Sequence, residues 1–308
     1  MTVEVSGETR LWFGPHDPVR AASGVAAFGD GWLVAQDDAN HAAWWRPTRG
    51  TIERIRLFPS RDGRDLFDEE SGTKRWKPDL ETACDVATDA GRAVLLLGSG
   101  SLAPRMRAAL VRPIDVGVDV QTADLTPLYA RVRDVLELRE ADLNLEGACV
   151  VGDRLRWFQR GHGRTGVDSA SVDVSLPALL AAVEGRLDPG QVEVGARRRY
   201  TLGTMAGITL AITDAVALHD GRICVSVTAE DTVDAVADGP VTGSALALVG
   251  DEDEPPVVLR LPPAAARAKV EGITVVGAGP GGVRLLAVVD DDDPASASRA
   301  FQLKVPVT

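Results

Sequence analysis

Short apolar runs recur along the whole chain, and turns that contain Gly or Asp separate them. Five segments start with Ser, Thr or Glu and continue with small or apolar residues, and each is followed by a turn and then by one of these apolar runs. The five segments are 23–28, 81–86, 146–151, 213–218 and 271–276. In 51–57, apolar and polar residues alternate, which is typical of a half-exposed strand. The pattern therefore predicts a series of β-hairpins.

The five segments are nearly evenly spaced, and their first residues lie 58, 65, 67 and 58 positions apart. A unit of about 60 residues is long enough for four short strands and their loops. Radial stacking buries both faces of such small sheets and leaves short, protected edges. We therefore predict an all-β fold, a five-bladed β-propeller that forms a single domain over 1–308. The expected blades lie near 22–60, 80–125, 145–202, 212–262 and 270–305.

The two ends of the chain complement each other in this arrangement. The fifth unit stops after its third strand, whereas residues 2–6 form a strand with no partner in the first unit. We expect this N-terminal strand to complete the last blade and close the ring. Longer insertions fall mostly at one face, in 60–79, in a helix that starts near Thr126, and in 230–243; a second short helix is expected near 175–184.

Composition limits the partners and the compartment. The chain has 45 acidic and 33 basic residues and a net charge of −12, which disfavours nucleic acid or an anionic membrane as the main partner. The sequence shows neither a signal peptide pattern nor a long apolar stretch, so we expect a cytoplasmic protein. Cys84, Cys149 and Cys224 lie in β-rich runs without metal-ligand spacing, so we expect buried free thiols. The oligomeric state stays open.

The lead residues of the five repeats are the strongest chemical signal. In a propeller, the innermost strands start around the top of the central channel, so these side chains would converge there. Converging carboxylates lose ionisation unless a cation lies among them, and Ca²⁺ accepts many oxygen ligands in flexible geometry. We therefore predict a metal site, most plausibly for Ca²⁺; the alternative is a water-filled channel whose carboxylates bond backbone N–H groups. The predicted ligands are Ser23, Glu81, Glu146, Thr213 and Glu271.

A second set of polar residues stands where the second strand of each unit ends, next to the same ring. Arg160 would stabilise negative charge, Asp38 would activate water, and His162 is the third expected catalytic residue. The remaining polar residues are expected to bind substrate, or alternatively only to cap loops; they are Asp37, Ser99, Ser101, Asp231 and Asp290.

The stretch 277–282 has the G-x-G-x-x-G spacing of a dinucleotide-binding loop. That motif requires a following helix and a further strand, whereas 283–289 is itself β-rich and the chain ends soon afterwards. We therefore expect a hairpin turn.

Three motifs carry resemblances to known families. The order Ser, Glu, Glu, Thr, Glu at the strand starts resembles the calcium-activated nucleotidases of the apyrase type, five-bladed propellers with a central Ca²⁺. The Glu-Gly strand starts are similar to those of phytase-like esterase propellers. The segments 77–81 (KPDLE), 98–101 (GSGS) and 144–147 (NLEG) resemble uncharacterised bacterial propellers known as domains of unknown function.

Together these expectations describe a Ca²⁺-binding propeller. The resemblance implies a hydrolase that acts on a small anionic ester or phosphoanhydride at the top of the channel. The alternative is a non-catalytic propeller that binds a ligand or a protein and holds a structural ion.

Overall fold

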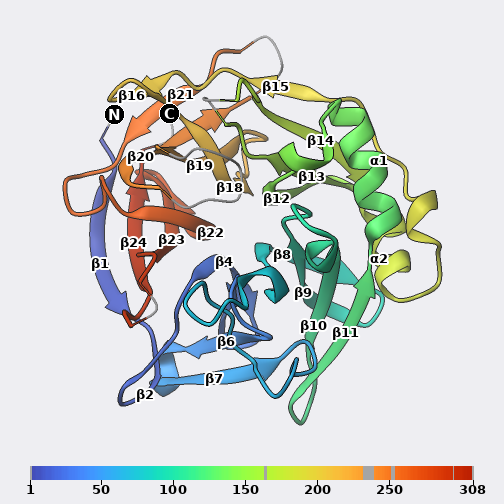
Figure 1. The fold of residues 1–308 in the computed structure, drawn as a ribbon. Coiled ribbons are helices and arrows are strands. Elements are labelled where there is room, and N and C mark those ends of the chain that lie inside the picture. Colours follow the sequence, from blue (N-terminus) through green and yellow to red (C-terminus); the bar gives the residue numbers. More distant parts are fainter. Residues whose placement is uncertain (1, 163–164, 232–238, 251–253, 294, 307–308) are drawn as a thin grey trace.

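The computed structural model confirms the predicted all-β fold: five four-stranded sheets stand around a central axis as the blades of a propeller (Figure 1). It describes residues 2–162, 165–231, 239–250, 254–293 and 295–306. Within the predicted loop 230–243, residues 232–238 therefore lie outside the described part.

Each blade is an antiparallel sheet, and in the first four blades the strands follow the chain order from the axis outward. Blade 1 consists of β4 (Ala22–Phe28), β5 (Gly31–Gln36), β6 (His41–Arg46) and β7 (Thr51–Arg56). Blade 2 consists of β8 (Leu80–Thr88), β9 (Gly91–Gly98), β10 (Arg107–Pro113) and β11 (Val118–Asp124). Blade 3 consists of β12 (Leu145–Val151), β13 (Arg154–Gln159), β14 (Ser169–Ser175) and β15 (Arg198–Tyr200). Blade 4 consists of β18 (Ala211–Ala217), β19 (Ile223–Glu230), β20 (Val241–Val249) and β21 (Val257–Arg260).

Blade 5 is built from both ends of the chain, as expected. Its inner strands are β22 (Lys269–Gly279), β23 (Gly282–Asp290) and β24 (Arg299–Val305), and its outer strand is β1 (Glu4–Arg10). The N-terminal strand begins two residues later than predicted and continues to Arg10, because β24 offers pairing partners as far as Arg299. The chain passes from β22 to β23 through a tight turn at Pro280 and Gly281, so the glycine-rich stretch 277–282 forms the end of a hairpin, as expected.

The remaining elements are short and decorate the blades. Two small hairpins are formed by β2 (Trp12–Gly14) with β3 (Asp17–Pro18), and by β16 (Thr204–Met205) with β17 (Ile208–Thr209). The 3₁₀ helices are η1 (Pro47–Arg49), η2 (Lys74–Trp76), η3 (Ala103–Arg105), η4 (Glu140–Asp142) and η5 (Pro189–Gln191).

Both predicted helices are present, as α1 (Thr126–Leu136) and α2 (Leu176–Val183). They lie at the outer rim beside blades 2 and 3 (Figure 1). Leu128 and Val132 of α1 and Leu179 of α2 are fully buried in one apolar cluster with residues of both blades. The helices therefore fill the gap between two blades and leave the channel open. None of the described helices is long and apolar enough to span a membrane.

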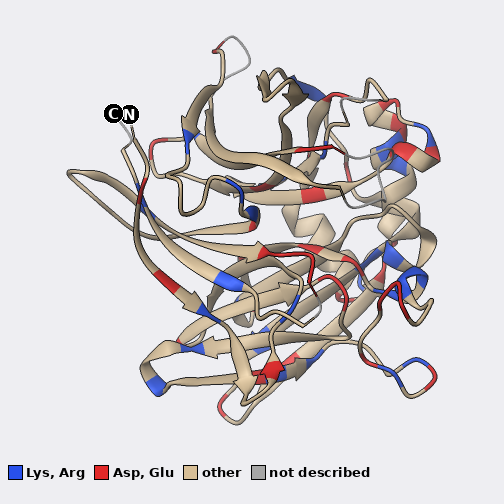
Figure 2. Cartoon of the chain, turned by 60° about the vertical axis from the view of Figure 1, so that its left-hand side comes forward, with Lys and Arg blue, Asp and Glu red and all other residues tan. Residues whose placement is uncertain are grey.

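The core lies between the blades. Leu33 of blade 1 and Leu96 of blade 2, for example, are fully buried in one cluster, and most charged residues lie in loops and at strand ends (Figure 2). Cys84, Cys149 and Cys224 are buried free thiols, as expected. This packing leaves the channel and the loops of one face as the place for polar chemistry.

A β-bulge interrupts the innermost strand of every blade at the same place. The pairing register shifts between Ala22 and Gly24, and at the matching point of the other four blades. The residues skipped by the pairing are the five lead residues, Ser23, Glu81, Glu146, Thr213 and Glu271. Because a bulge re-aims the side chain of the extra residue, the same backbone device repeats five times around the channel.

Candidate functional site at the channel mouth

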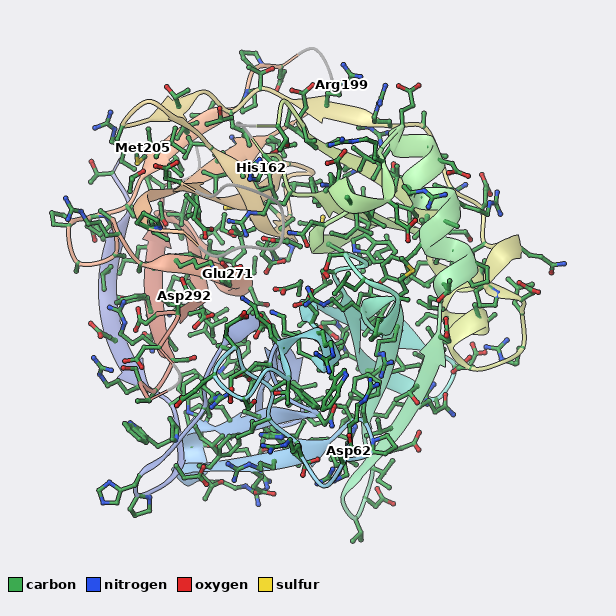
Figure 3. The ribbon with its side chains drawn as sticks, in the orientation of Figure 1. Asp62, His162, Arg199, Met205, Glu271 and Asp292 are labelled. Carbon is green, nitrogen blue, oxygen red and sulfur yellow. The ribbon has the colours of Figure 1, made fainter. Side chains whose placement is uncertain are left out.

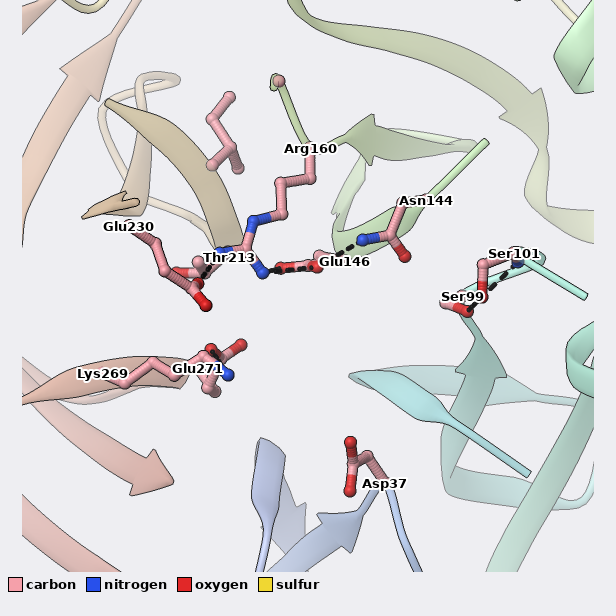
Figure 4. A network of polar contacts seen from close by, with 12 residues as sticks. Asp37, Ser99, Ser101, Asn144, Glu146, Arg160, Thr213, Glu230, Lys269 and Glu271 are labelled. Carbon is pink, nitrogen blue, oxygen red and sulfur yellow. Dashed lines mark hydrogen bonds and ion pairs between the residues drawn. The ribbon is translucent and has the colours of Figure 1, made fainter. Parts of the chain in front are cut away.

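The start of the innermost strands encloses a small cavity at the axis, which we call the mouth. Its volume is about 50 Å³. All five blades contribute side chains, and Figure 4 shows many of these side chains from close by. The mouth is lined by Ser23, Asp37, Lys77, Asp79, Glu81, Arg105, Asn144, Glu146, Arg160, Glu230, Lys269, Glu271 and Asp290.

Charge dominates this lining. It contains seven carboxylates and four cationic side chains, an excess of three negative charges if all are ionised. Burying charges is costly unless they are paired and hydrogen-bonded. The partners of each group therefore decide what the mouth can hold.

Two of the predicted ligands are close to basic side chains. Arg160 Nη1 donates to Glu146 Oε1 at 2.8 Å, and its Nη2 donates to Glu230. Lys269 Nζ lies 3.4 Å from Glu271 Oε1 and 3.0 Å from Asp292 Oδ1. Burial nevertheless raises the pKa of the Glu271 carboxyl to about 8, against the opposing charge of Lys269. The Arg160 guanidinium is thus already engaged on both sides by carboxylates.

A buried network holds Asp79 in place. Arg105 Nη1 donates to Asp79 Oδ2 at 2.9 Å and to Ser101 Oγ at 2.8 Å, while Ser99 Oγ also donates to Asp79. Although burial acts in the opposite direction, Lys77 and Arg105 lower the pKa of Asp79 to about 2. The two serines predicted to bind substrate therefore hold a carboxylate of the mouth.

Glu81 differs from the other carboxylates. Only 9% of the residue is exposed, and it accepts no hydrogen bond and makes no ion pair with any residue that the structure describes. Burial raises the pKa of its carboxyl well above the ordinary value, and the charges of Asp79 and Asp37 raise it further. Carboxylate oxygens of Asp37, Asp79 and Glu81 lie within 4.8 Å of one another, a spacing that could hold a metal ion.

The two hydroxyls of the predicted metal ring are used between blades. Ser23 Oγ donates to the Leu80 carbonyl oxygen of blade 2. Thr213 Oγ1 lies 2.6 Å from the Val270 carbonyl oxygen of blade 5 and 2.9 Å from Ser226 Oγ. In both cases the hydroxyl reaches the carbonyl just before the lead glutamate of the next blade. Hydrogen bonds from these side chains therefore join neighbouring blades and position Glu81 and Glu271.

The structure does not bring Asp38, Arg160 and His162 together. Arg160 lines the mouth, whereas Asp38 lines a neighbouring cavity and accepts a hydrogen bond from Arg20 at 2.6 Å. His162, labelled in Figure 3 together with Glu271 of the mouth, lines neither cavity, and its Nδ1 lies 3.2 Å from Thr165 Oγ1.

The neighbouring cavity, which we call the chamber, has a volume of about 530 Å³. It adjoins the mouth, and both linings include Asp37, Lys77 and Asp290. The loop 60–79 forms one wall and is fastened by the Phe67 amide, which donates to the Asp38 carbonyl oxygen at 2.9 Å. The other residues of the lining are Arg20, Ala21, Asp38, Phe67, Asp68, Glu69, Glu70, Lys74, Asp292, Asp293 and Ala295.

Sequence reasoning found Arg160 but missed the other three basic side chains of the mouth. A usable signal was present, because alternate residues of an extended segment face the same side. Asp79, Asn144 and Lys269 each stand two positions before a lead glutamate and line the mouth with it. At the end of β19, Glu230 lines the mouth, rather than Asp231, which was the expected residue. The missed residues of the mouth are Lys77, Asp79, Arg105, Asn144 and Lys269.

Solved structures share the fold at low sequence identity. The major allergen Mala s 1 of Malassezia sympodialis aligns over 98% of this chain and 97% of its own, with 9% identity and a TM-score of 0.52. Glutaminyl cyclase from Myxococcus xanthus aligns over 100% of this chain and 97% of its own, with 12% identity and a TM-score of 0.45. The likeness to Mala s 1 shows the fold alone. No curated protein sequence matches the chain. Residues 18–305 match the family of unknown function DUF6929, and the chain belongs to that family.

Proposed function

We propose that this propeller binds a divalent cation, in the first instance Ca²⁺, at the mouth of its channel. The observation that carries the proposal is Glu81, a buried carboxylate without a hydrogen-bond donor among the described residues, within 4.8 Å of two other carboxylates. Carboxylate oxygens are the ligands that Ca²⁺ prefers. Asp37 and Asp79 can accept a cation while bonded to Lys77, because each ionised carboxylate has about four lone-pair positions.

The sizes of the two cavities suit two different ligands. A mouth of about 50 Å³ has room for an ion and a few water molecules, but not for an organic molecule. The chamber, at about 530 Å³, lies within the range of small-molecule sites. We therefore propose that the ion binds in the mouth and that a small molecule binds in the adjoining chamber.

The activity that we propose is metal-dependent hydrolysis of a small ester or phosphoanhydride. A bound divalent cation would polarise a carbonyl or phosphoryl oxygen and lower the pKa of a water molecule. The protein would contribute the fixed carboxylates of the mouth and the chamber that orients the substrate. Arg160, which is held by Glu146 and Glu230, would keep two carboxylates in position rather than act directly on the substrate.

One observation favours a non-catalytic alternative. Lys77 Nζ forms ion pairs with Asp37 and, at 2.5 Å, with Asp79. Its ammonium group therefore already supplies positive charge to the carboxylates that would bind a metal. In that case the mouth would be an internal ion-pair network, and the propeller would bind a ligand or a protein without turnover. Metal binding separates a metal site at the mouth from an internal ion-pair network.

The test is thermal unfolding of chelator-treated protein with and without Ca²⁺, Mg²⁺ or Mn²⁺. At 100 times its Kd, a bound ion stabilises the fold by about 2.7 kcal/mol, which for a chain of this size is a rise in Tm of roughly 5 °C. Glu81→Gln should abolish that rise. Without metal the same variant should be at least as stable as the wild type, since it removes an uncompensated buried carboxylate.

Glu53→Gln is the matched control, because Glu53 lies on the outer strand of blade 1 and its side chain is 49% exposed. It should keep the full metal response. If no divalent ion raises Tm, or if Glu81→Gln responds like the wild type, the mouth is not a metal site and the ion-pair network takes its place.

A further inference from the structure

We propose that the chamber binds an organic cation, a small molecule with an ammonium or guanidinium group on a short apolar stem. This inference deepens the proposed function. It rests on one part of that proposal, namely that the chamber is the place where a small molecule binds. It narrows the proposed substrate to an ester that carries a cationic group and excludes the phosphoanhydride, so the ligand's charge is opposite to the one that the sequence motifs led us to expect.

The charge of the lining is the first argument. Eight carboxylates and three cationic side chains surround one cavity, an excess of five negative charges if all are ionised. The three cationic side chains are already counted in this excess, and each is paired with carboxylates: Arg20 with Asp38, Lys74 with Glu69, and Lys77 with Asp37 and Asp79. A divalent ion in the mouth would still leave the combined site negative. An anion entering the chamber would therefore meet repulsion, whereas a cation would be attracted.

The chamber is more than an acidic surface patch. It encloses about 530 Å³, and its wall includes the buried ring of Phe67 together with Ala21 and Ala295. A small hydrated ion would fill only part of this volume and would gain nothing from contact with the apolar wall. An amine with a carbon stem matches both, since the stem packs on Phe67 and the alanines while the charged group meets the carboxylates.

Asp38 offers a specific acceptor. It is joined to Arg20 by one hydrogen bond, from Arg20 Nε to Asp38 Oδ2 at 2.6 Å. Asp38 Oδ1 and Arg20 Nη2 are buried and have no partner among the described residues. Neither atom is open to solvent, so a ligand N–H group bonds Asp38 Oδ1 after a small shift of the chamber wall, and it does so without displacing Arg20. A charge-assisted hydrogen bond of this kind is stronger than one between neutral groups.

The test uses three probes with the same four-methylene stem, namely putrescine, 1,4-butanediol and adipate. Binding is measured by calorimetry at constant ionic strength, in chelator and again with Ca²⁺. We expect saturable binding of putrescine only. Glu69→Gln combined with Glu70→Gln, two exposed acids of the chamber rim, should weaken it by about threefold to tenfold. Asp38→Asn should weaken it by about tenfold or more.

A control pair separates the chamber from general attraction to an acidic protein. Asp89→Asn combined with Asp153→Asn removes the same charge from hairpin turns at the opposite face. Equal losses in the control and rim pairs, equal binding of adipate, or no saturable binding of putrescine would each overturn the proposal. Putrescine binding in chelator does not depend on the metal, so failure here and failure of the metal site are separate results.

Discussion

Replacing Lys77 by Gln tests how the mouth balances its charges. Lys77 is 8% exposed, and its ammonium group is paired with Asp37 and Asp79. Its removal leaves Asp37 and Glu81 without a paired cation, within 4.8 Å of Asp79, which keeps its ion pair with Arg105. Breaking a buried ion pair by removing one partner costs about 3–5 kcal/mol. For a chain of this size that loss corresponds to a fall in Tm of roughly 5 to 8 °C in the absence of metal.

Calcium should reverse most of this loss. Two unit charges 4 Å apart at an effective dielectric constant of 20 interact by about 4 kcal/mol. Removing the ammonium group therefore removes a strong repulsion of the incoming ion, and Ca²⁺ should bind Lys77→Gln about tenfold or more tightly than the wild type. Saturating Ca²⁺, at about 1,000 times its Kd, would return about 4 kcal/mol.

The assay is thermal unfolding followed by circular dichroism, with calorimetric titration of Ca²⁺. Lys304→Gln is the control, because Lys304 carries the same charge on a side chain that is 59% exposed. The reasoning is wrong if Lys77→Gln melts within about 2 °C of the wild type. It is also wrong if Ca²⁺ stabilises Lys77→Gln and the wild type equally.

Two further predictions concern the fold. Burial lowers the pKa of His41 from 6.5 to about 4. As pH falls below 6.5, His41 is therefore protonated in the unfolded chain but stays neutral in the folded chain. Between pH 7 and pH 5 the free energy of unfolding should drop by about 2 kcal/mol more in the wild type than in His41→Gln. Denaturant titrations at both pH values measure this, and His219→Gln, at an exposed position, should behave as the wild type. Gly147→Ala would place a methyl group 2.5 Å from the Asp214 Cα atom, and should destabilise the fold by about 3 kcal/mol or more, whereas Gly281→Ala, with open space around it, should cost less than about 0.5 kcal/mol. Equal midpoints for the two glycine variants, or parallel pH profiles for the two histidine variants, would contradict these accounts.

The propeller could be predicted because its cause is local and repeated. Each hairpin is coded by a short apolar run and a turn, and the spacing of the repeats sets the number of blades. The positions of Glu81, Glu146 and Glu271 at the mouth follow from the same repeat, because a bulge occurs at the same residue of each innermost strand.

The grouping of side chains within the site could not be predicted in the same way. The ends of the second strands were placed correctly beside the channel, but a strand end does not determine which partner a long side chain will meet. Arg160 reaches Glu146 and Glu230, while Asp38 turns to Arg20 in another cavity. These choices depend on residues far away in the sequence and on the packing of a long loop.

The strand that completes blade 5 also has a consequence for how the chain is made. Ser6 and Gln302, which bond across the β1 and β24 pair, are 296 positions apart. At a synthesis rate of about 5 to 20 residues per second, β1 leaves the ribosome roughly 15 to 60 s before its partner. During that interval β1 is an unpaired edge, and edges of this kind pair readily with other chains. The period of greatest aggregation risk should therefore fall before translation ends, and it should lengthen when translation slows.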